Sequence, residues 1–419
     1  MLTFSRLTYI RNIIGQAKKN KILDASFRVI SLRLRKVGTH PRLVLGIETS
    51  CDDTGAAVVD DKGNILGDAL NSQTKVHVNH GGIIPSVAQD LHRENIDVIV
   101  QEALKSANVV LQDIEAIAVT TKPGLALSLG VGLEYAKDLV KESSKPMIPI
   151  HHMEAHALTV RLLKKVDFPY LVFLMSGGHC LLAVANDIDD FDMLGTSLDE
   201  APGDCIDKTA RSLGLKNLPQ CEGLSGGGAI EMMAKNGDPL SFPVPHVMTH
   251  YRDCDFSFTG LKTYFKRLIH DEVTKQDLAE GQLLSNVSDV CAALQYAMTY
   301  TLCRKLQRAF IYSELKGLLP EQNRVLVASG GVASNQYIRR GLTQVCDMFS
   351  CQLICPPPHL CTDNGIMIAW NGMEKLMAGK EIAEDPMSIR FEPKFPFGID
   401  RRDDVRLMNI KLPKLKLKS

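Results

Sequence analysis

LVLGIETSCDDTGAAVVDDKGNILG (residues 43–67) has the pattern of two β-strands joined by a turn of small residues, and this stretch decides the fold. A later stretch, YLVFLMSGGHCLLAVANDIDDFDMLG (residues 170–195), repeats the plan of apolar strand, small-residue turn, apolar strand and acidic turn. Sequence compatible with a helix follows each of them, at 86–107 and at 203–215. We therefore predict an α/β protein with two equivalent halves, each opening on a hairpin.

Two further segments place a strand directly before glycine and a helix. They are AIAVTTKPGLALSLGVGLEYAKDLV (residues 116–140) and RVLVASGGVASNQYIRRGLTQVC (residues 324–346). Glycine turns of this kind let backbone N–H groups at a helix start face a phosphate or an adenosine. A last helix is predicted within residues 360–379, with Thr362, Asp363 or Asn364 as its N-cap. The pattern indicates two lobes with a nucleotide in the cleft.

The first 42 residues differ in composition from the rest of the chain. They hold ten Lys or Arg and one acidic residue, Asp24, among Leu, Ile, Phe and Ser, which is typical of a mitochondrial transit peptide. A basic arm that binds nucleic acid is the alternative. We therefore expect a mitochondrial protein with the presequence at 1–42. The predicted domains are a first lobe at 43–165 with 365–395, a second lobe at 166–364, and a basic C-terminal tail at 396–419.

Composition indicates a globular protein that is not inserted in a membrane. Apolar residues make up 45% and charged residues 23% of the chain, and no stretch approaches the run of about 20 apolar residues that a membrane span requires. The eleven cysteines are scattered rather than paired at zinc-ribbon spacing, so we expect buried, reduced thiols.

The segment IHHMEAHAL (residues 150–158) contains two histidines, His152 and His156, one helical turn apart. On a helix their side chains lie on one face and are close enough to share a metal. A zinc protease of the H-E-x-x-H type needs its glutamate directly after the first histidine, where this chain has Met153, and Glu154 falls elsewhere around the helix. The spacing alone leaves ordinary helix histidines and a non-protease metal site both open.

The glycine turns and the CDDTG segment together resemble the actin, sugar-kinase and heat-shock-chaperone ATPase superfamily. In that two-lobed fold, two hairpins flank the phosphates of a nucleotide in the cleft between the lobes, and a third glycine turn holds the adenosine.

Six motifs make the resemblance more specific. They are GIETSCDDTG (46–55), HHMEAH (151–156), MSGGH (175–179), CDFSFTGLKT (254–263), ASGGVASN (328–335) and CTDNGIMIAW (361–370). Their order and spacing resemble the tRNA threonylcarbamoyl-adenosine transferase family, once labelled O-sialoglycoprotein endopeptidase. The resemblance covers about residues 43–395, and the SGGH form of the third motif is that of bacterial and organellar members.

The resemblance implies a metal site. In the family, the paired histidines and the aspartate of the TDNG turn hold one divalent ion, and the matching residues are His152, His156 and Asp363. Two imidazoles and a carboxylate leave coordination positions open for substrate oxygens, and iron or zinc suits them. Archaeal-type members have a tyrosine at the position of Leu174, so a fourth protein ligand is not assigned.

The resemblance also implies the residues that contact the adenylate. The matching positions are Leu174, Met175, Ser176, Gly177, Gly178, Asp207, Gly227, Glu231, Ser334, Asn335 and Thr362. A longer loop, PQCEGLSGGGAIE (residues 219–231), replaces the family's Pro-Gly-Gly loop, so Gly227 and Glu231 are the best matches at that point. No general base stands out.

The implied reaction transfers a threonylcarbamoyl group from threonylcarbamoyl-AMP, made by a separate synthase, to the exocyclic amine of a tRNA adenosine. That adenosine lies 3′ of the anticodon in tRNAs that read codons beginning with A, and organellar members are expected to act as homodimers. Lys262, Lys266, Arg267 and the C-terminal lysines are candidates for tRNA contacts. A metalloprotease and a non-catalytic chaperone-like ATPase are the alternatives.

Overall fold

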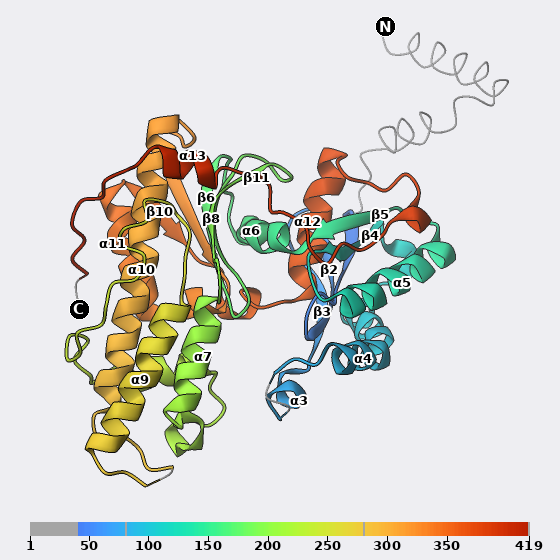
Figure 1. Ribbon diagram of the computed structural model, residues 1–419. Coiled ribbons are helices and arrows are strands. Elements are labelled where there is room, and N and C mark those ends of the chain that lie inside the picture. Colours follow the sequence, from blue (N-terminus) through green and yellow to red (C-terminus); the bar gives the residue numbers. More distant parts are fainter. Residues whose placement is uncertain (1–40, 80–81, 280, 418–419) are drawn as a thin grey trace, which may run out of the picture. The chain divides into compact units, whose positions relative to one another are not determined.

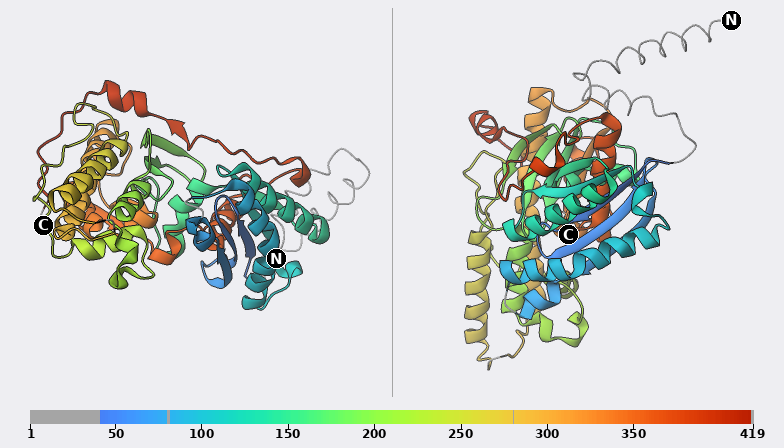
Figure 2. Two further views of the ribbon diagram at one scale, coloured as in Figure 1. Left: turned by 60° about the horizontal axis from the view of Figure 1, so that its bottom comes forward. Right: turned by 90° about the vertical axis from the view of Figure 1, so that its right-hand side faces the viewer.

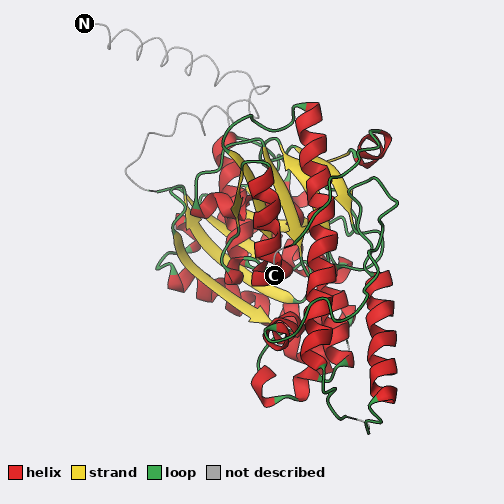
Figure 3. Cartoon of the chain, turned by 90° about the vertical axis from the view of Figure 1, so that its left-hand side faces the viewer, coloured by secondary structure: helices red, strands yellow, loops and turns green. Residues whose placement is uncertain are grey.

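The computed structural model of the protein describes residues 41–79, 82–279 and 281–417. Residues 1–40 of the predicted presequence lie outside this part of the chain. From Leu43 onward the chain forms one compact unit, built on two mixed β-sheets that are covered by helices (Figures 1 and 3).

The first sheet has five strands in the order β3-β2-β1-β4-β5. They are β1 (Leu43–Glu48), β2 (Asp53–Asp60), β3 (Ile65–Ser72), β4 (Ala116–Lys122) and β5 (Met147–His151). The first three strands form an antiparallel meander, while β4 pairs in parallel with both β1 and β5. The predicted hairpin at 43–67 is therefore present and is extended by a third strand.

The second sheet repeats this arrangement and has the order β10-β9-β6-β7-β8-β11. Its strands are β6 (Tyr170–Met175), β7 (Cys180–Ala185), β8 (Phe191–Thr196), β9 (Arg324–Ser329), β10 (Cys351–Ile354) and β11 (Ile399–Asp400). Again the first three strands are antiparallel, and the next two are parallel to the first. The predicted α/β class with two equivalent, hairpin-led halves is confirmed.

Helices cover both faces of the first sheet. In chain order the helices of this half are α3 (Thr74–Asn79), α4 (Pro85–Ser106), α5 (Ala126–Ser143), α6 (His152–Leu163) and α12 (Gly365–Ala378), and all but α3 pack on the sheet. Alternate residues of β1 face opposite sides: Leu45 and Ile47 pack with residues of α4 and α5, and Val44 packs with residues of α12. Helix α12 therefore lies on the first sheet although it follows the first five strands of the second sheet in the sequence.

The second sheet carries a larger set of helices. They are α7 (Pro202–Ser212), α8 (Gly226–Ala234), α9 (Thr259–Lys275), α10 (Val287–Lys316), α11 (Gln336–Met348) and α13 (Arg402–Leu407). The buried α10 is the longest of them, and it packs against α8, α9 and α11. Short 3-10 helices are η1 (Leu111–Asp113), η2 (Leu215–Asn217), η3 (Pro219–Cys221), η4 (Gly331–Ser334), η5 (Pro358–Leu360) and η6 (Pro386–Ser388).

Helix α6 lies between the two halves and contacts both (Figure 1). Its Ala155 packs with residues of α12 and the first sheet, whereas Met153 and Ala157 pack with residues of β6 and β9 in the second. Because α6 carries the histidine pair, this position places the pair at the junction of the two halves.

The segment after α12 returns to the second sheet, as the left view of Figure 2 shows. The sequence predicted only a basic tail beyond residue 395. In the structure, β11 pairs in parallel with β8, and α13 follows it. Among the described residues, no helix has both the length and the apolar character that a membrane crossing demands.

Candidate functional site

The histidine pair is placed by the direct passage from β5 into α6. His151 ends the strand, and its Nδ1 caps the helix by accepting the N–H of Met153 at 3.2 Å. His152 and His156 then occupy successive turns of α6, with ring centroids 4.7 Å apart, and both side chains are buried. Because no loop separates β5 from α6, this edge strand of the first sheet fixes the position of the two imidazoles.

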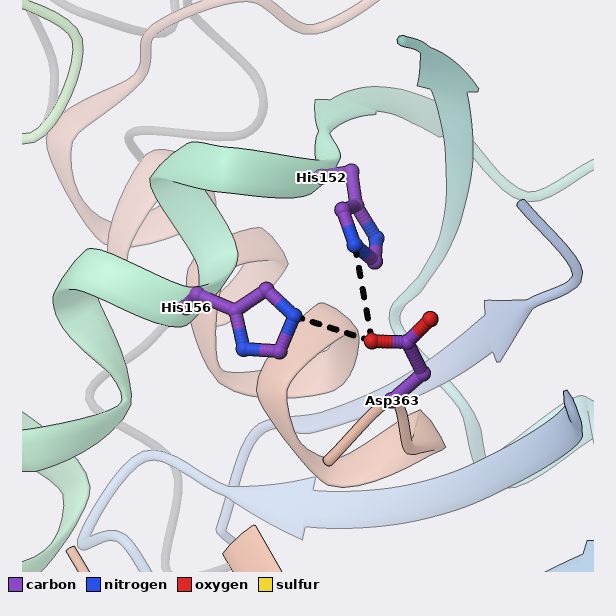
Figure 4. A group of neighbouring side chains, drawn as sticks. All are labelled: His152, His156 and Asp363. Carbon is purple, nitrogen blue, oxygen red and sulfur yellow. Dashed lines mark hydrogen bonds and ion pairs between the residues drawn. The ribbon is translucent and has the colours of Figure 1, made fainter. Parts of the chain in front are cut away.

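Asp363 comes to the histidines from the start of α12. Asn364, one of the three predicted caps, is the N-cap of α12 and accepts the N–H of Met367 at 2.9 Å. The Oδ1 atom of Asp363 lies 3.0 Å from Nε2 of His156 and 3.5 Å from Nε2 of His152 (Figure 4). The structure thus brings Asp363 to a histidine that lies 207 positions earlier in the chain.

The carboxylates beside the histidines suit a cation. Although burial opposes it, the carboxylates of Asp363 and Glu48 raise the pKa of His152 to about 9, so a bound metal would take the place of the proton on its Nε2. Burial also acts against ionisation of Asp363, but His152 and His156 hold its pKa well below the usual range. One atom from each of the three residues lies within 4.8 Å of the other two, and imidazole nitrogens with a carboxylate oxygen are ligands that zinc and iron accept. His152, His156 and Asp363 therefore fit the predicted metal site.

A buried carboxylate behind the site orients His152. Glu48, at the end of β1, accepts from Nδ1 of His152 at 3.1 Å and from the hydroxyl of Thr120 at 2.8 Å. Ser50 Oγ also lies 3.0 Å from the same Nδ1. A carboxylate only accepts, so the Nδ1 proton points to Glu48 and Nε2 is left for a metal.

Glu48 was not among the site residues predicted from the sequence. The available signal was a carboxylate at the end of an otherwise apolar strand, directly before a turn.

The glycine turn of the second half meets this site. The chain leaves β6 at Met175, and Ser176 Oγ accepts the N–H groups of Gly178 at 3.2 Å and His179 at 3.0 Å. A Cβ added at Gly177 or Gly178 would meet no atom within 4 Å, so this backbone is open to a ligand. A small cavity joins the turn to the histidines and is lined by Met153, His156, Leu174, Met175, Ser176, His179 and Gly330.

His179 is a second residue at the site that was not predicted from the sequence. It is the last residue of the quoted MSGGH motif, and its side chain is exposed at the cavity.

The ASGGVASN turn continues from the cavity toward the other predicted binding residues. Gly330 has a left-handed backbone (φ 99°), and a Cβ there would overlap the carbonyl group of Met175, so the turn requires glycine. Asn335 ends the turn as the N-cap of α11, accepting the N–H of Ile338 at 3.0 Å. Its side-chain oxygen also accepts from Gln295 of α10 at 3.0 Å.

Asp207 on α7 and Gly227 and Glu231 on α8 lie on this side of the second half. Glu231 accepts the backbone N–H of Gln336 at 2.8 Å, directly after the Ser334–Asn335 turn. Asp207 packs so tightly on α8 that a Cβ at Gly226 would overlap its carboxylate. Burial raises the pKa of Asp207, and the N–H of Gly227 partly offsets this rise.

The predicted substrate positions therefore fall into two neighbouring groups, one at the histidines and one around α8 and α11. Thr362 is exposed beside Asp363.

Glu154 is turned away from the histidines. Its carboxylate accepts from the Nζ atom of Lys375 at 2.9 Å, in the interior between α6 and α12. The residue that a metalloprotease would need as its base is thus held in an ion pair elsewhere.

Comparison with known proteins gives one consistent family. Residues 64–370 match the family described as tRNA N6-adenosine threonylcarbamoyltransferase. The chain is 54% identical to the Mus musculus protein named "tRNA N6-adenosine threonylcarbamoyltransferase, mitochondrial" over 92% of this chain and 94% of that one. The proteins of that name from Homo sapiens (53%; 92% and 94%) and Danio rerio (52%; 95% and 98%) are similarly close.

These relatives confirm the predicted mitochondrial location, since all three are named as mitochondrial proteins. They also confirm the predicted enzyme class, a transferase. The matched region contains the histidine pair, the MSGGH turn and Asp363. The chain belongs to the tRNA N6-adenosine threonylcarbamoyltransferase family.

Proposed function

We propose that this protein transfers the threonylcarbamoyl group of threonylcarbamoyl-AMP to the exocyclic amine of the adenosine 3′ of the anticodon. Its substrates would be mitochondrial tRNAs that read codons beginning with A. The observation that carries the proposal is one small cavity, in a chain of this family, that is lined both by His156 of the His152–His156–Asp363 group and by Ser176 of the open glycine turn at 176–178. Residues that suit a cation and a turn that suits a phosphate thus border the same cavity.

In this proposal the second half binds the adenylate. The N–H groups of the Gly177–Gly178 turn receive the phosphate, because exposed backbone donors at a tight turn favour an anion. Ser334 and Asn335 hold the adenosine, and Asp207 or Glu231 accepts from the ribose hydroxyls. Hydrogen bonds to the phosphate would stabilise the charge that develops on AMP as it leaves.

One divalent ion, iron or zinc, would be held by His152, His156 and Asp363 and would supply Lewis acidity toward the mixed anhydride. Glu48 keeps the Nδ1 proton of His152 and so presents Nε2. The amine nitrogen attacks the carbamoyl carbon and forms the new N–C bond. The bond from that carbon to the phosphate oxygen breaks, AMP departs, and the amine loses a proton. No side chain is assigned to accept that proton.

The tRNA would contact exposed basic residues. Lys266 and Arg267 are exposed on α9, whereas Lys262 is paired with Glu200. Near the C-terminus, three further lysines are exposed: Lys411, Lys414 and Lys416. A separate synthase as the source of the adenylate and a homodimeric assembly complete the proposal, and the family resemblance supports both.

The pairing of Glu154 with Lys375 speaks against the metalloprotease alternative.

The test is transfer of labelled threonylcarbamoyl from its adenylate to mitochondrial tRNA by the purified full chain, with and without a chelator. We expect product in tRNAs for codons beginning with A, loss of transfer with chelator, and a rate at least about 100-fold lower for His156→Ala. The matched control is His246→Ala, which removes an exposed histidine stacked on Tyr300. Consumption of the adenylate with no tRNA product would refute the transferase, and an unchanged His156→Ala rate would refute the metal assignment.

A further inference from the structure

The two helices at the candidate metal site are also joined through a buried ion pair. Nζ of Lys375 on α12 lies 2.9 Å from Oε2 of Glu154 on α6. The Lys375 side chain is fully buried, with 0% exposure, and it also pairs with Glu381, whose side chain is 37% exposed. Glu154 is buried too.

Glu154 occupies the face of α6 opposite the histidines. It is two residues from His152 and two from His156, which on an α-helix is a rotation of about 200° from each. The histidines contact Asp363, directly before α12, and Glu154 contacts Lys375, in the last turn of α12. Contacts from two opposite faces of α6 to α12 and the turn that precedes it fix the rotation of α6 about its own axis.

Stability alone does not account for this pair. Removing an ammonium and a carboxylate from water is costly, and replacing a buried pair by apolar groups of similar volume is often neutral or stabilising. What the pair supplies is a defined position for two helices. We propose that Glu154 and Lys375 are positioning residues, which hold α6 against α12 so that His152 and His156 face Asp363 at metal-binding separation. This inference rests on the proposed function, since it presumes that these three residues hold the metal.

The same two helices offer a matched control. Nε of Arg161 on α6 lies 2.7 Å from Oε1 of Glu374 on α12, in a pair that is also partly buried. Arg161 lies five residues beyond His156, and it also stacks over the ring of Phe168, with Cζ 4.2 Å from the ring centroid. A variant here alters an ion pair between the same helices, farther along α6 from the ligands.

The experiment measures Zn²⁺ binding to the metal-free full chain by competition with a chromophoric chelator, together with the thermal unfolding midpoint. The double variant Glu154→Gln/Lys375→Met removes both charges, so no lone charge stays buried. We expect it to fold, with a Zn²⁺ dissociation constant at least about tenfold higher than wild type, as for other residues that support metal ligands. Glu374→Gln should bind Zn²⁺ within about twofold of wild type. Glu154→Gln alone keeps the side-chain shape and should weaken binding in the same direction.

A purely structural role gives a different result. In that case the double variant, once folded, would bind Zn²⁺ as tightly as wild type, and this outcome overturns the inference. Should the double variant fail to fold, unchanged affinity in folded Glu154→Gln overturns it equally. A wild-type chain that binds no Zn²⁺ would remove the metal from the proposed function and this inference with it, and that result is visible before any variant is made.

Discussion

His151, the residue between the strand and the helix of the site, should make stability depend on pH. Burial, and then the charge of Lys122, lower the pKa of His151 to about 3. The unfolded chain takes up a proton near pH 6.5 and the folded chain does not, so this stabilisation is complete above pH 6.5 and declines as the pH falls. From pH 7 to pH 5 we expect a loss of about 2 kcal/mol in the free energy of unfolding from this residue.

Urea unfolding of wild type and His151→Gln at both pH values measures this loss. All other groups are the same in the two proteins, so the difference between the two losses is assigned to His151. An equal loss in wild type and variant would show that His151 is not the source.

At the scale of single residues, the sequence located the candidate metal ligands better than the residues that orient them. The spacing of His152 and His156 was enough to put them on one face of a helix, and Met153 directly after the first histidine argued against a zincin. Their contacts with Glu48 and Asp363 depend on which strand ends and helix starts meet in space. Local spacing does not contain that information, and the family resemblance supplied only Asp363.

Helix α12 reaches the first sheet through glycines, and this close approach should be intolerant of any side chain. A Cβ at Gly46 of β1 would overlap the backbone N of Ala369 and the carbonyl oxygen of Gly365. The clash is with helix backbone, which cannot move without displacing α12. We expect Gly46→Ala to lower the free energy of unfolding by about 3 kcal/mol, at the upper end for overpacking. Because Asp363 directly precedes α12, Zn²⁺ affinity should fall as well.

The control for Gly46 is Gly130→Ala in α5. A Cβ there meets only the ring of Phe391, at 3.5 Å, which is ordinary contact, and alanine favours a helix by up to about 1 kcal/mol over glycine. Urea unfolding should therefore show unchanged or slightly higher stability. A Gly46→Ala protein as stable as Gly130→Ala would mean that α12 and β1 are not packed at backbone contact.

At the scale of elements, long periodic segments were predictable and short ones were not. The hairpins at 43–67 and 170–195 carry apolar runs bounded by turns, and α4, α5 and α11 follow from periodicity. The two-residue β11 has no such pattern, because its backbone partners are supplied by β8. Its existence depends on an open sheet edge elsewhere in the chain, which is why the sequence suggested only a tail.

At the scale of the whole described unit, the segment after α12 connects the two halves. Along the first half, the N–H of Ala383 bonds to Met147 at 2.9 Å and that of Glu392 to Thr121 at 2.8 Å. The segment then passes His151, which Phe397 contacts, and continues into β11 on the second sheet. The polypeptide thus crosses between the halves once more after the helix that holds the site, and this late crossing gives the C-terminal region a structural role.

Phe397 is where this crossing should matter most. Its ring is 5% exposed, with its centroid 4.7 Å from that of Phe191 in the second half and 5.6 Å from that of His151 in the first. Phe397→Ala would leave a cavity between the halves, and we expect a loss of about 3–5 kcal/mol in the free energy of urea unfolding. Leu407→Ala, at an 82% exposed position in α13, should change it by no more than about 0.5 kcal/mol. Equal effects of the two substitutions would show that the segment lies on the surface without joining the halves. A much larger loss for Phe397→Ala than for Leu407→Ala would make the segment part of the core that holds α6 and the histidine pair in place.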